Sequence, residues 1–387
     1  AEDGTVIQGF TIQNGEDGIS PFARFSLLNC RIWNTSDGID FEGGSGGLIQ
    51  FNTFEFNSDD GLDLDDEVDV VIADNLIRNN GQDGIEIRLQ SYTGPVQNVL
   101  ITRNQIYGND GDGIQFLDFG DRTDRRFDIT YNYIYDNTDA GIGMMDSSSS
   151  TEDYRATSIP EPIFVFNNTF ARNNHGISGG DSTVVLNNIF VDHPVIAVKN
   201  VDGGSELAFN LFFNNGTDNS GSNVDAGSSV FANPLLTVDL EIPSESPALD
   251  AGTALYMWHG LTVLDLPFSA YVGAAPDIGA FESEDAPPPN AAPTANYTWS
   301  ATDLTVDFTD TSTDGDGTIE TWAWDFGDGN TSTVQNPQHT YASAGGYTVT
   351  LSVTDDDGAS SASPASQTVS PTAPNQAPTA KLSLIHI

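Results

Sequence analysis

The sequence DGIDFE at residues 37–42 returns as DGLDLD at residues 60–65 and as DGIEIR at residues 83–88. Each copy reads Asp-Gly, an aliphatic residue, an acid, an apolar residue and a charged residue, and the copies lie 23 residues apart. Apolar and polar residues that alternate over so short a stretch are typical of a β-strand with one buried face. The fixed period predicts a repeat protein whose units stack on one another.

Stacking would align equivalent residues of the three copies in columns. The first column is Asp40, Asp63 and Glu86, and the second is Glu42, Asp65 and Arg88. Because parallel strands lie about 4.8 Å apart, these columns would concentrate charge on one face of the protein. Such a concentration requires a physical explanation.

Two further columns extend the repeat over most of the first 230 residues. One is an Asn two residues before an apolar residue, with Cys30 in the same register; it comprises Asn52, Asn75, Asn104, Asn132, Asn168, Asn188 and Asn210. The other is a Gly before Ile or Leu, at Gly18, Gly38, Gly61, Gly84, Gly113, Gly141 and Gly176. We expect each Gly to adopt positive φ at a corner, and each Asn to tolerate the left-handed conformation and bond to the next Asn. The pattern predicts a parallel β-helix of roughly nine coils.

Residues 1–230 resemble the right-handed parallel β-helix repeat proteins of the pectate-lyase-like superfamily. Beyond them, ANPLL (residues 232–236), SPALDAG (246–252) and DIGAFE (277–282) resemble the closing segment of many secreted bacterial β-helix proteins. We expect residues 231–284 to cap the open edge of the last coil, since an uncovered edge would invite pairing with other chains.

A Pro-rich linker, DAPPPN at residues 285–290, marks a change of composition. Residues 291–371 resemble a PKD-type, immunoglobulin-like β-sandwich, through WAWDFGDG (322–329), NPQHTY (336–341) and GYTVTLSVTD (346–355). Residues 347–353 alternate as a half-buried strand should, and Trp324 and Phe326 are suited to the core. Residues 372–387 are interpreted as a linker and the truncated start of a second copy. The predicted fold class is therefore all-β: a right-handed parallel β-helix followed by a PKD-type sandwich.

The net charge of −44 argues against a nucleic-acid partner, because phosphates would be repelled. It favours a protein that lives in salt or binds divalent cations. The single cysteine allows no intramolecular disulfide, and no apolar run is long enough to span a membrane. From the resemblance we expect a bacterial or archaeal protein that is secreted or held at the cell surface, and we expect it to be monomeric.

Three consecutive coils are longer than the others, and their extra residues fall in the segments 89–96, 117–127 and 144–160. Insertions at one corner of neighbouring coils would form a wall beside the charged columns, where function is usually placed. Five of the ten arginines lie there, at Arg88, Arg122, Arg125, Arg126 and Arg155, together with Tyr92, Phe119 and Tyr154. Tyr92, Phe119, Tyr154 and Arg155 are candidates for binding an anionic polysaccharide. Alternatively, the loop arginines merely pair with the Asp residues around them.

The acidic columns suggest a Ca²⁺ site, because Ca²⁺ takes six to eight oxygen ligands. Asp40, Glu42, Asp63, Asp65 and Glu86 could supply them. The resemblance to pectate-lyase-like enzymes implies that Ca²⁺ neutralises a uronate carboxylate while an Arg or Lys removes the adjacent proton, giving β-elimination. By that resemblance the base would be Arg88, Arg122, Arg125 or Arg126.

Three alternatives stay open. Carboxylates on neighbouring coils could instead act as the paired acids of a polygalacturonase-like glycoside hydrolase. The Asp of each Asp-Gly is well explained as turn chemistry, with the outward acids simply solvated. Finally, the whole chain could be a non-catalytic surface or adhesion protein, since β-helices host both enzymes and non-enzymes.

Overall fold

The protein forms two compact units, residues 1–287 and 288–387, and each is described by itself. The structure is a computed structural model. It describes residues 4–65, 68–90, 92, 94, 96–119, 125–146, 159–283, 292–315, 317–356 and 358–375. Among these residues no helix is long and apolar enough to cross a membrane.

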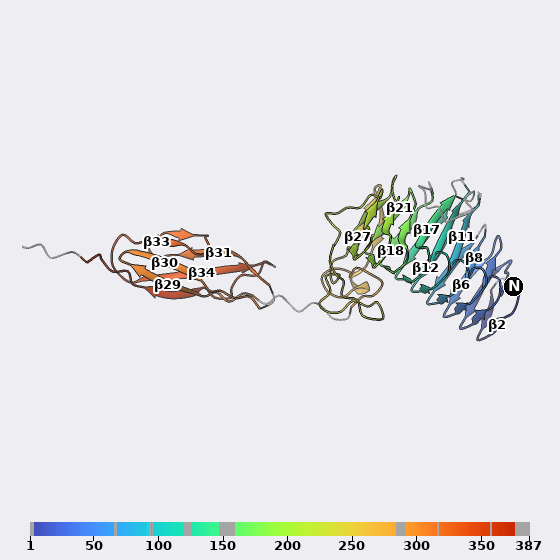
Figure 1. Ribbon diagram of the computed structural model, residues 1–387, viewed down its shortest axis with the longest axis horizontal. Helices are drawn as coiled ribbons and strands as arrows, with labels where there is room; N and C mark the ends of the chain where they lie inside the picture. Colours follow the sequence, from blue (N-terminus) through green and yellow to red (C-terminus); the bar gives the residue numbers. More distant parts are fainter. Residues whose placement is uncertain are drawn as a thin grey trace, which may run out of the picture. The chain divides into compact units, whose positions relative to one another are not determined.

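The first unit is a stack of coils that forms three parallel sheets, which we call A, B and C (Figure 1). Within the described residues, sheets A and B have nine strands each and sheet C has eight. Each coil contributes its strands in the order A, B, C, so the predicted parallel β-helix is confirmed. Sheet A comprises β1 (Thr5–Gln8), β3 (Arg24–Leu28), β6 (Gly46–Gln50), β9 (Asp69–Ala73), β12 (Gln97–Thr102), β15 (Arg125–Thr130), β18 (Ile163–Phe166), β21 (Thr183–Leu186) and β24 (Glu206–Ala208).

The strands of the other two sheets are mostly shorter. Sheet B comprises β2 (Thr11–Gln13), β4 (Arg31–Trp33), β7 (Thr53–Glu55), β10 (Leu76–Arg78), β13 (Gln105–Tyr107), β16 (Tyr133–Tyr135), β19 (Thr169–Ala171), β22 (Ile189–Val191) and β25 (Leu211–Phe213). Sheet C comprises β5 (Ile39–Phe41), β8 (Leu62–Leu64), β11 (Ile85–Leu89), β14 (Ile114–Asp118), β17 (Ala140–Asp146), β20 (His175–Ser178), β23 (Ile196–Lys199) and β26 (Asn219–Ser220).

The inward residues of all three sheets make one continuous apolar core. On sheet C the aliphatic residue of each Asp-Gly-aliphatic motif points inward, as Ile39, Leu62 and Ile85 show by their complete burial. The residue two positions later also points inward, so the acids between them face outward. A single coil could not bury this apolar stripe, and stacking does so for all of them.

Two buried ladders of side-chain amides hold successive coils together. In the ladder between sheets A and B, each Asn oxygen accepts hydrogen bonds of 2.8–3.0 Å from the backbone N–H and the amide of the Asn one coil earlier. Its members are Asn52, Asn75, Asn104, Asn132, Asn168, Asn188 and Asn210. Cys30 precedes them and donates its backbone N–H to Asn52, so its predicted place in the column is confirmed.

A second ladder, which the sequence did not reveal, runs between sheets B and C. It comprises Asn57, Asn80, Asn109, Asn137 and Asn173, bonded in the same manner. His193 takes the next position, with its Nδ1 2.9 Å from the Asn173 carbonyl oxygen. Burial lowers the pKa of His193 to about 4, so the imidazole is neutral at physiological pH. Histidine here is a structural substitute for Asn.

The expectation that the column glycines and the ladder Asn residues adopt positive φ is wrong. Neither group is among the residues with positive φ. The left-handed residue is instead the one just before Cys30 and just before each Asn of the ladder between sheets A and B: Asn29, Phe51, Asp74, Arg103, Tyr131, Asn167, Asn187 and Phe209. The column glycines serve close packing, because a Cβ on Gly84 would lie 2.5 Å from the carbonyl oxygen of Gly113.

We therefore expect Gly84→Ala to destabilise the β-helix by about 1–3 kcal/mol, the usual range for overpacking. The added methyl would meet backbone on the next coil and the Ile106 side chain at 2.6 Å, neither of which can move freely. Gly227→Ala is the matched control, because its Cβ would contact only the Asp225 carboxylate, at 3.3 Å. Urea denaturation of the two variants checks the difference, and equal midpoints would contradict it.

Residues 231–283 lie mainly along the sides of the stack, whereas we expected a cap on its open edge. Leu240, Ile242, Ala248 and Ile278 pack on the outer face of sheet B. The hairpin of β27 (Leu255–Trp258) and β28 (Leu261–Asp265), followed by the 3₁₀ turn η1 (Phe268–Ala270), places apolar side chains on the outer face of sheet A. At the open edge of the last coil, Val224 and Val230 form isolated β-bridges with Leu207 and Leu211.

The second unit is the predicted β-sandwich. One sheet has the order β29 (Tyr297–Thr302), β30 (Thr305–Asp310), β33 (Gln338–Thr340), and the other β32 (Thr331–Ser332), β31 (Ile319–Asp325), β34 (Tyr347–Asp355), β35 (Ala365–Val369). Trp324 and Phe326 are buried in its core, as predicted. Strand β34 alternates between buried and partly exposed residues over the range expected.

Candidate functional site

The outer face of sheet C carries the predicted acidic column. Asp40 of β5 is in register with Asp63 of β8, and Asp63 with Glu86 of β11. The next residue in the column is Gln115 of β14, so the run of acids ends there. Three carboxylates on adjacent strands are thus brought together by the repeat alone.

These outward carboxylates are unexpectedly buried. Asp63 is only 5% exposed and Glu86 7%. One oxygen each of Asp40 and Asp63, Oδ1 in both cases, is buried without a hydrogen-bond partner. A buried acceptor that no donor meets is costly, so this face is not an ordinary solvated surface.

Burial and mutual repulsion shift the protonation of these acids. Burial raises the pKa of Asp63 to about 8, with a further contribution from the charge of Glu86 and an opposing one from Arg88. Burial likewise raises the pKa of Glu86, although Arg88 opposes the shift, and that of Asp40, where Glu42 adds to it. Near neutral pH the face therefore retains protons that exposed carboxylates would have lost.

Arg88 is the cation of this face. Its Nη1 lies 3.0 Å from Asp63 Oδ2 and 3.0 Å from Asp65 Oδ1, and its Nε contacts Glu86. Burial alone would lower the pKa of Arg88, but these three carboxylates outweigh burial and raise it. In this arrangement Arg88 is firmly protonated.

The carboxylates form close groups in which one oxygen from each residue lies within 4.8 Å of the others. One group is Asp40, Asp63 and Asp65, and a second is Asp60, Asp63 and Glu86. We call these five acids the acidic cluster. Oxygen-only ligands and two unpartnered oxygens fit a hard cation such as Ca²⁺. Glu42, a predicted ligand, is in none of the groups found among the described residues.

Four aspartates of the Asp-Gly column have a structural role that supports the turn interpretation. From Asp37 onward, each carboxylate accepts a hydrogen bond from the backbone N–H one coil later: Asp37 accepts from Asp60 at 2.9 Å, and Asp60 accepts from Asp83 at 2.7 Å. The same bonding continues through Asp83 and ends with Asp112, which accepts from Ala140. This aspartate ladder closes the corner between sheets B and C.

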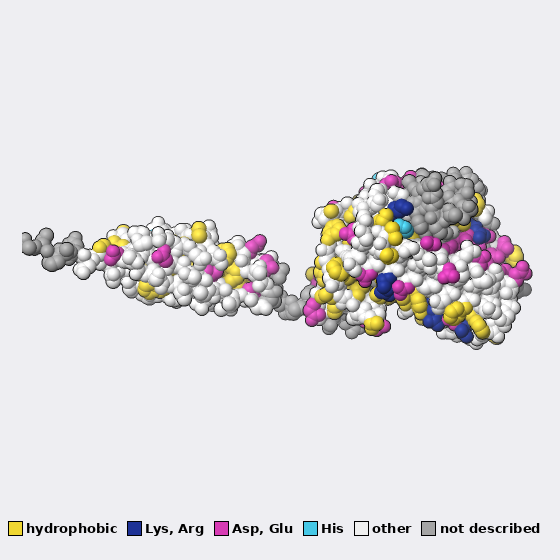
Figure 2. Space-filling view, viewed as in Figure 1, with side chains coloured by type: hydrophobic (Ala, Val, Ile, Leu, Met, Phe, Trp, Pro, Cys, Tyr) yellow, Lys and Arg dark blue, Asp and Glu magenta, His cyan; other side chains and the backbone are white. Residues whose placement is uncertain are grey.

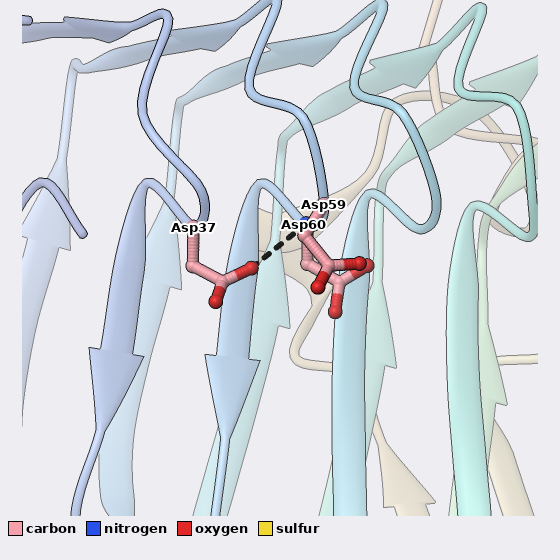
Figure 3. Close-up of side chains that lie close together, drawn as sticks. All are labelled: Asp37, Asp59 and Asp60. Atoms are coloured by element: carbon pink, nitrogen blue, oxygen red, sulfur yellow. Dashed lines mark hydrogen bonds between the residues drawn. The ribbon is translucent and has the colours of Figure 1, made fainter. Parts of the chain in front are cut away.

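Asp60 also belongs to the acidic cluster, which sequence reasoning missed. It forms a third close group with Asp37 and Asp59, shown in Figure 3, where the dashed line marks the bond between Asp37 and Asp60. Burial raises the pKa of Asp37 to about 6 and that of Asp60 well above its usual range. The doublet of adjacent acids at residues 59–60 was the available signal, because it breaks the one-acid pattern of the neighbouring turns.

Two predicted catalytic arginines have other partners. Arg125 is buried and donates to the carbonyl oxygens of Arg88, at 3.2 Å, and Gln90, at 2.9 Å. Arg126 makes a bidentate ion pair of 2.8 Å with Asp128, as the alternative interpretation expected. Both belong to β15 on sheet A, so only Arg88 of the described candidates enters the acidic cluster.

The predicted sugar-binding residues are placed only in part. Tyr92 is partly buried, and the guanidinium carbon of Arg125 lies 5.5 Å from its ring centroid. Phe119 follows β14 and is 44% exposed. Arg122, Tyr154 and Arg155 lie outside the described residues.

Comparison with known proteins agrees with the two units of the fold. Residues 24–159 match the family model of the right handed beta helix region, and residues 286–370 match that of the PKD domain. The pre-pro-metalloprotease PrtV of Vibrio cholerae is 43% identical over 98 residues, which are 25% of this chain and 10% of that protein. The chain thus spans about a tenth of the length of the curated relatives it matches.

Two solved structures illustrate the likeness of each unit. The PKD1 domain of Vibrio anguillarum Epp is 40% identical with a TM-score of 0.21, over 22% of this chain and 99% of that domain. The pectate lyase Pel9A is 16% identical with a TM-score of 0.46, over 71% of this chain and 73% of the enzyme. Together with the three parallel sheets, the two family matches identify the chain as a right-handed parallel β-helix protein with a C-terminal PKD domain.

Proposed function

We propose that this is a secreted protein whose acidic cluster binds Ca²⁺ and cleaves a uronic-acid polysaccharide by β-elimination. The observation that carries the proposal is the pair of buried, unpartnered oxygens on Asp40 and Asp63. A cation bound between them would contact both oxygens and so remove the free-energy cost of burying two acceptors without partners. The pre-pro form of the Vibrio cholerae relative favours export of this chain as well.

The charge of the protein favours a metal-dependent interaction with such a polymer. On the side of the β-helix unit that Figure 2 shows, acidic side chains are scattered over the surface, with Lys and Arg side chains among them. A polyanion would be repelled by the net charge of −44. A divalent cation bound at the surface lowers that repulsion where the polymer must approach.

Asp40, Asp63 and Asp65 are the residues that would hold the ion. When bound, Ca²⁺ would supply positive charge that neutralises the uronate carboxylate and acidifies the neighbouring C–H. Tyr92 and Phe119, and with them Tyr154 and Arg155, are proposed to contact the sugar. Glu86 would contribute from the second close group, with Asp60 and Asp63, and Glu42 would act through the local charge rather than as a close ligand.

Arg88 is the described arginine best placed to remove the proton. It is protonated while paired with Asp63, Asp65 and Glu86. Its pKa is raised by those same carboxylates, so engaging them elsewhere would release it toward its ordinary value. Arg125 and Arg126 are held by carbonyl oxygens and by Asp128, and Arg122 stays a further candidate.

The test is to incubate the protein with pectate or alginate in the presence of Ca²⁺. The unsaturated products of β-elimination are detected by their ultraviolet absorbance. Wild-type protein should produce them, and EDTA should stop the reaction. Arg88→Ala should lower kcat/KM by roughly 10³-fold, as expected for loss of a general base. Arg31→Ala is the control, because Arg31 pairs with Glu55 on sheet B and should leave activity unchanged.

Each outcome separates the candidate functions. No product from any uronate polymer, with Ca²⁺ present, would refute the lyase proposal. Tight polysaccharide or cell binding without turnover would instead support an adhesion protein. New reducing ends without ultraviolet absorbance would indicate hydrolysis.

Hydrolysis is the second candidate, and one observation favours it. Asp60, Asp63 and Glu86 lie close together, and the pKa of Asp63, raised by burial to about 8, keeps that carboxyl protonated at neutral pH. A protonated acid beside a second carboxylate is the arrangement that glycosidases use to protonate a leaving group.

A further inference from the structure

Two adjoining hollows lie on the outer face of sheet B, where residues 233–240 cross it. The larger, of about 310 Å³, is lined among others by Arg172, Asp192, Phe213 and residues 233–237. The smaller, of about 110 Å³, is lined by Gln105, Tyr133, Tyr135, Arg172 and residues 238–240. Because Arg172 and Leu240 line both, the hollows form one groove, which we call the sheet B groove.

The wall of this groove is held in place by its own hydrogen bonds. Ser246 donates its hydroxyl proton to the Pro234 carbonyl oxygen at 2.7 Å. The N–H of Thr237 donates to the Glu241 carbonyl oxygen at 2.9 Å, and that of Leu240 to the Thr237 carbonyl oxygen at 3.1 Å. The Leu240 side chain is buried against sheet B. The groove is therefore formed before a ligand binds, which reduces the cost of ordering it on binding.

Arg172 stands between the two hollows. Its Nε and Nη2 each lie 2.8 Å from a carboxylate oxygen of Asp136, and its guanidinium carbon lies 5.6 Å from the ring centroid of Tyr135. The hydrogen bonds to Asp136 and the charge of Asp192 raise the pKa of Arg172, so the guanidinium stays charged. The side chain is still 42% exposed, and its Nη1 bonds to no described residue. Arg172 can therefore donate to a ligand in the groove.

Other exposed groups of the groove can accept as well as donate. Gln105 is exposed, and its side-chain amide bonds to no described residue. Asp192 is also exposed, and one of its carboxylate oxygens accepts from the Asn214 amide at 2.6 Å. Leu235, which is 45% exposed, and the partly exposed Phe213 add apolar surface. The groove thus offers donors, acceptors and apolar side chains close together.

This combination selects an uncharged ligand that carries many hydroxyl groups. Asp136, Asp192 and Asp239 bring three negative charges to the groove. Only Arg172 opposes them, so an anionic ligand would be repelled. An uncharged sugar can instead accept from Arg172 and Gln105 and donate to Asp192, while its C–H groups contact the apolar side chains. The larger hollow is at the lower end of the range for small-molecule sites, which suits a short stretch of a sugar chain.

An extended peptide is a poorer match for the groove. Such peptides commonly bind by pairing with a free sheet edge. Among the described strands that form the floor, β13, β16, β19 and β22 already have a neighbour on both sides. The last strand of the sheet, β25, is met at Leu211 by Val230. Side-chain groups, rather than backbone groups, are therefore what the groove presents.

We propose that the sheet B groove binds a short stretch of an uncharged polysaccharide, with Arg172, Gln105 and Asp192 as its polar contacts. The proposal goes beyond the proposed function, because the groove lies on another sheet and shares no residue with the acidic cluster. It gives the protein a hold on an uncharged glycan that does not depend on Ca²⁺.

The experiment is titration calorimetry of the full chain in EDTA with four uncharged tetrasaccharides: cellotetraose, xylotetraose, mannotetraose and β-1,4-galactotetraose. At least one should bind, and Arg172→Asn should weaken its binding about tenfold or more, as expected for one hydrogen bond from a charged donor. Asparagine is chosen because it tolerates the φ of +57° at residue 172. Gln105→Ala should weaken binding several-fold, whereas Gln13→Ala, at an exposed glutamine of β2 outside the groove, should not.

Arg103→Asn is the matched control for Arg172→Asn. Arg103 also has positive φ (+54°), also makes a bidentate pair of 2.8 Å, with Asp74, and is also exposed, but it lines neither hollow. This variant should bind as wild type does, which separates loss of a ligand contact from loss of a surface ion pair.

Binding of none of the four sugars, or binding that survives Arg172→Asn, would overturn the proposal. Tighter binding of tetragalacturonate than of every uncharged sugar would overturn it as well. Because EDTA removes Ca²⁺ and no turnover is measured, the result is independent of whether the lyase proposal succeeds.

Discussion

Asn132→Ala is expected to lower the free energy of unfolding of the β-helix by about 4–6 kcal/mol, the largest effect of any single change considered. The Asn132 oxygen accepts from the backbone N–H of Asn104 at 2.9 Å and from its amide at 3.0 Å. Its own amide donates to the carbonyl oxygens of Ile101 and Thr130 and to Asn168. Alanine would leave several of these groups buried and unmet, at about 1–3 kcal/mol each.

Asn98→Ala is the matched control, because Asn98 lies on the exposed side of β12 and makes none of these ladder contacts. Its unfolding should stay within about 0.5 kcal/mol of wild type. Guanidinium denaturation measures both, and hydrogen exchange should show the loss of protection centred on the coils of Asn104 and Asn168. A loss below 1.5 kcal/mol for Asn132→Ala would mean that water replaces the missing amide.

Asp63→Asn is expected to stabilise the protein by several kcal/mol at pH 8 in EDTA, and to change little at pH 4. Burial raises the pKa of Asp63 to about 8, so between pH 4 and 8 the folded protein holds a proton that the unfolded chain has lost. The contribution of Asp63 to stability is therefore fully present below pH 4 and is lost as pH rises to 8, by on the order of 5 kcal/mol. Asparagine is neutral throughout and removes that loss.

Calcium provides the second half of this experiment. Wild-type protein at pH 8 should gain thermal stability when Ca²⁺ is added, because the ion would neutralise the negative charge of the buried Asp63 carboxylate. Asp63→Asn should gain much less. Asp136→Asn is the control, because Asp136 is a surface residue paired with Arg172 and should respond as wild type does. A wild-type melting temperature that stays constant from pH 5 to 8 in EDTA would contradict the buried-carboxylate interpretation.

The coil architecture could be predicted from the sequence because spacing alone specifies it. Once the copies at Asp40, Asp63 and Glu86 are aligned, parallel pairing leaves no choice of register, and the structure has that register. The PKD-type unit could be predicted for a similar reason, from Trp324 and an alternating strand. The prediction of positive φ at the column glycines was wrong, because a repeat pattern does not distinguish a glycine needed for positive φ from one needed for close contact with the next coil.

The site was less predictable, because its properties depend on where long side chains reach. The spacing of the repeats does not show that Arg88 forms ion pairs with three carboxylates of its own face. It also does not show that Arg125 donates its hydrogen bonds to backbone carbonyl oxygens. Asp60 was assigned to the turn, where its carboxylate does accept a hydrogen bond from Asp83, but the same carboxylate also lies in the acidic cluster. In addition, an alternation of apolar and polar residues does not show whether an outward-facing acid is buried.

The two amide ladders have an electrostatic consequence for the stack as a whole. In both, one side-chain N–H donates to the coil that follows and the oxygen accepts from the coil that precedes, while the second N–H of Asn52 and of Asn132 donates to a carbonyl oxygen of the preceding coil. The amide dipoles are therefore aligned and their partial charges add along the axis, as peptide dipoles do in an α-helix. The first coils carry the negative ends of these rows and the last coils the positive ends. A β-helix built in this way has a macrodipole that its sheets alone, whose strand dipoles largely cancel, would lack.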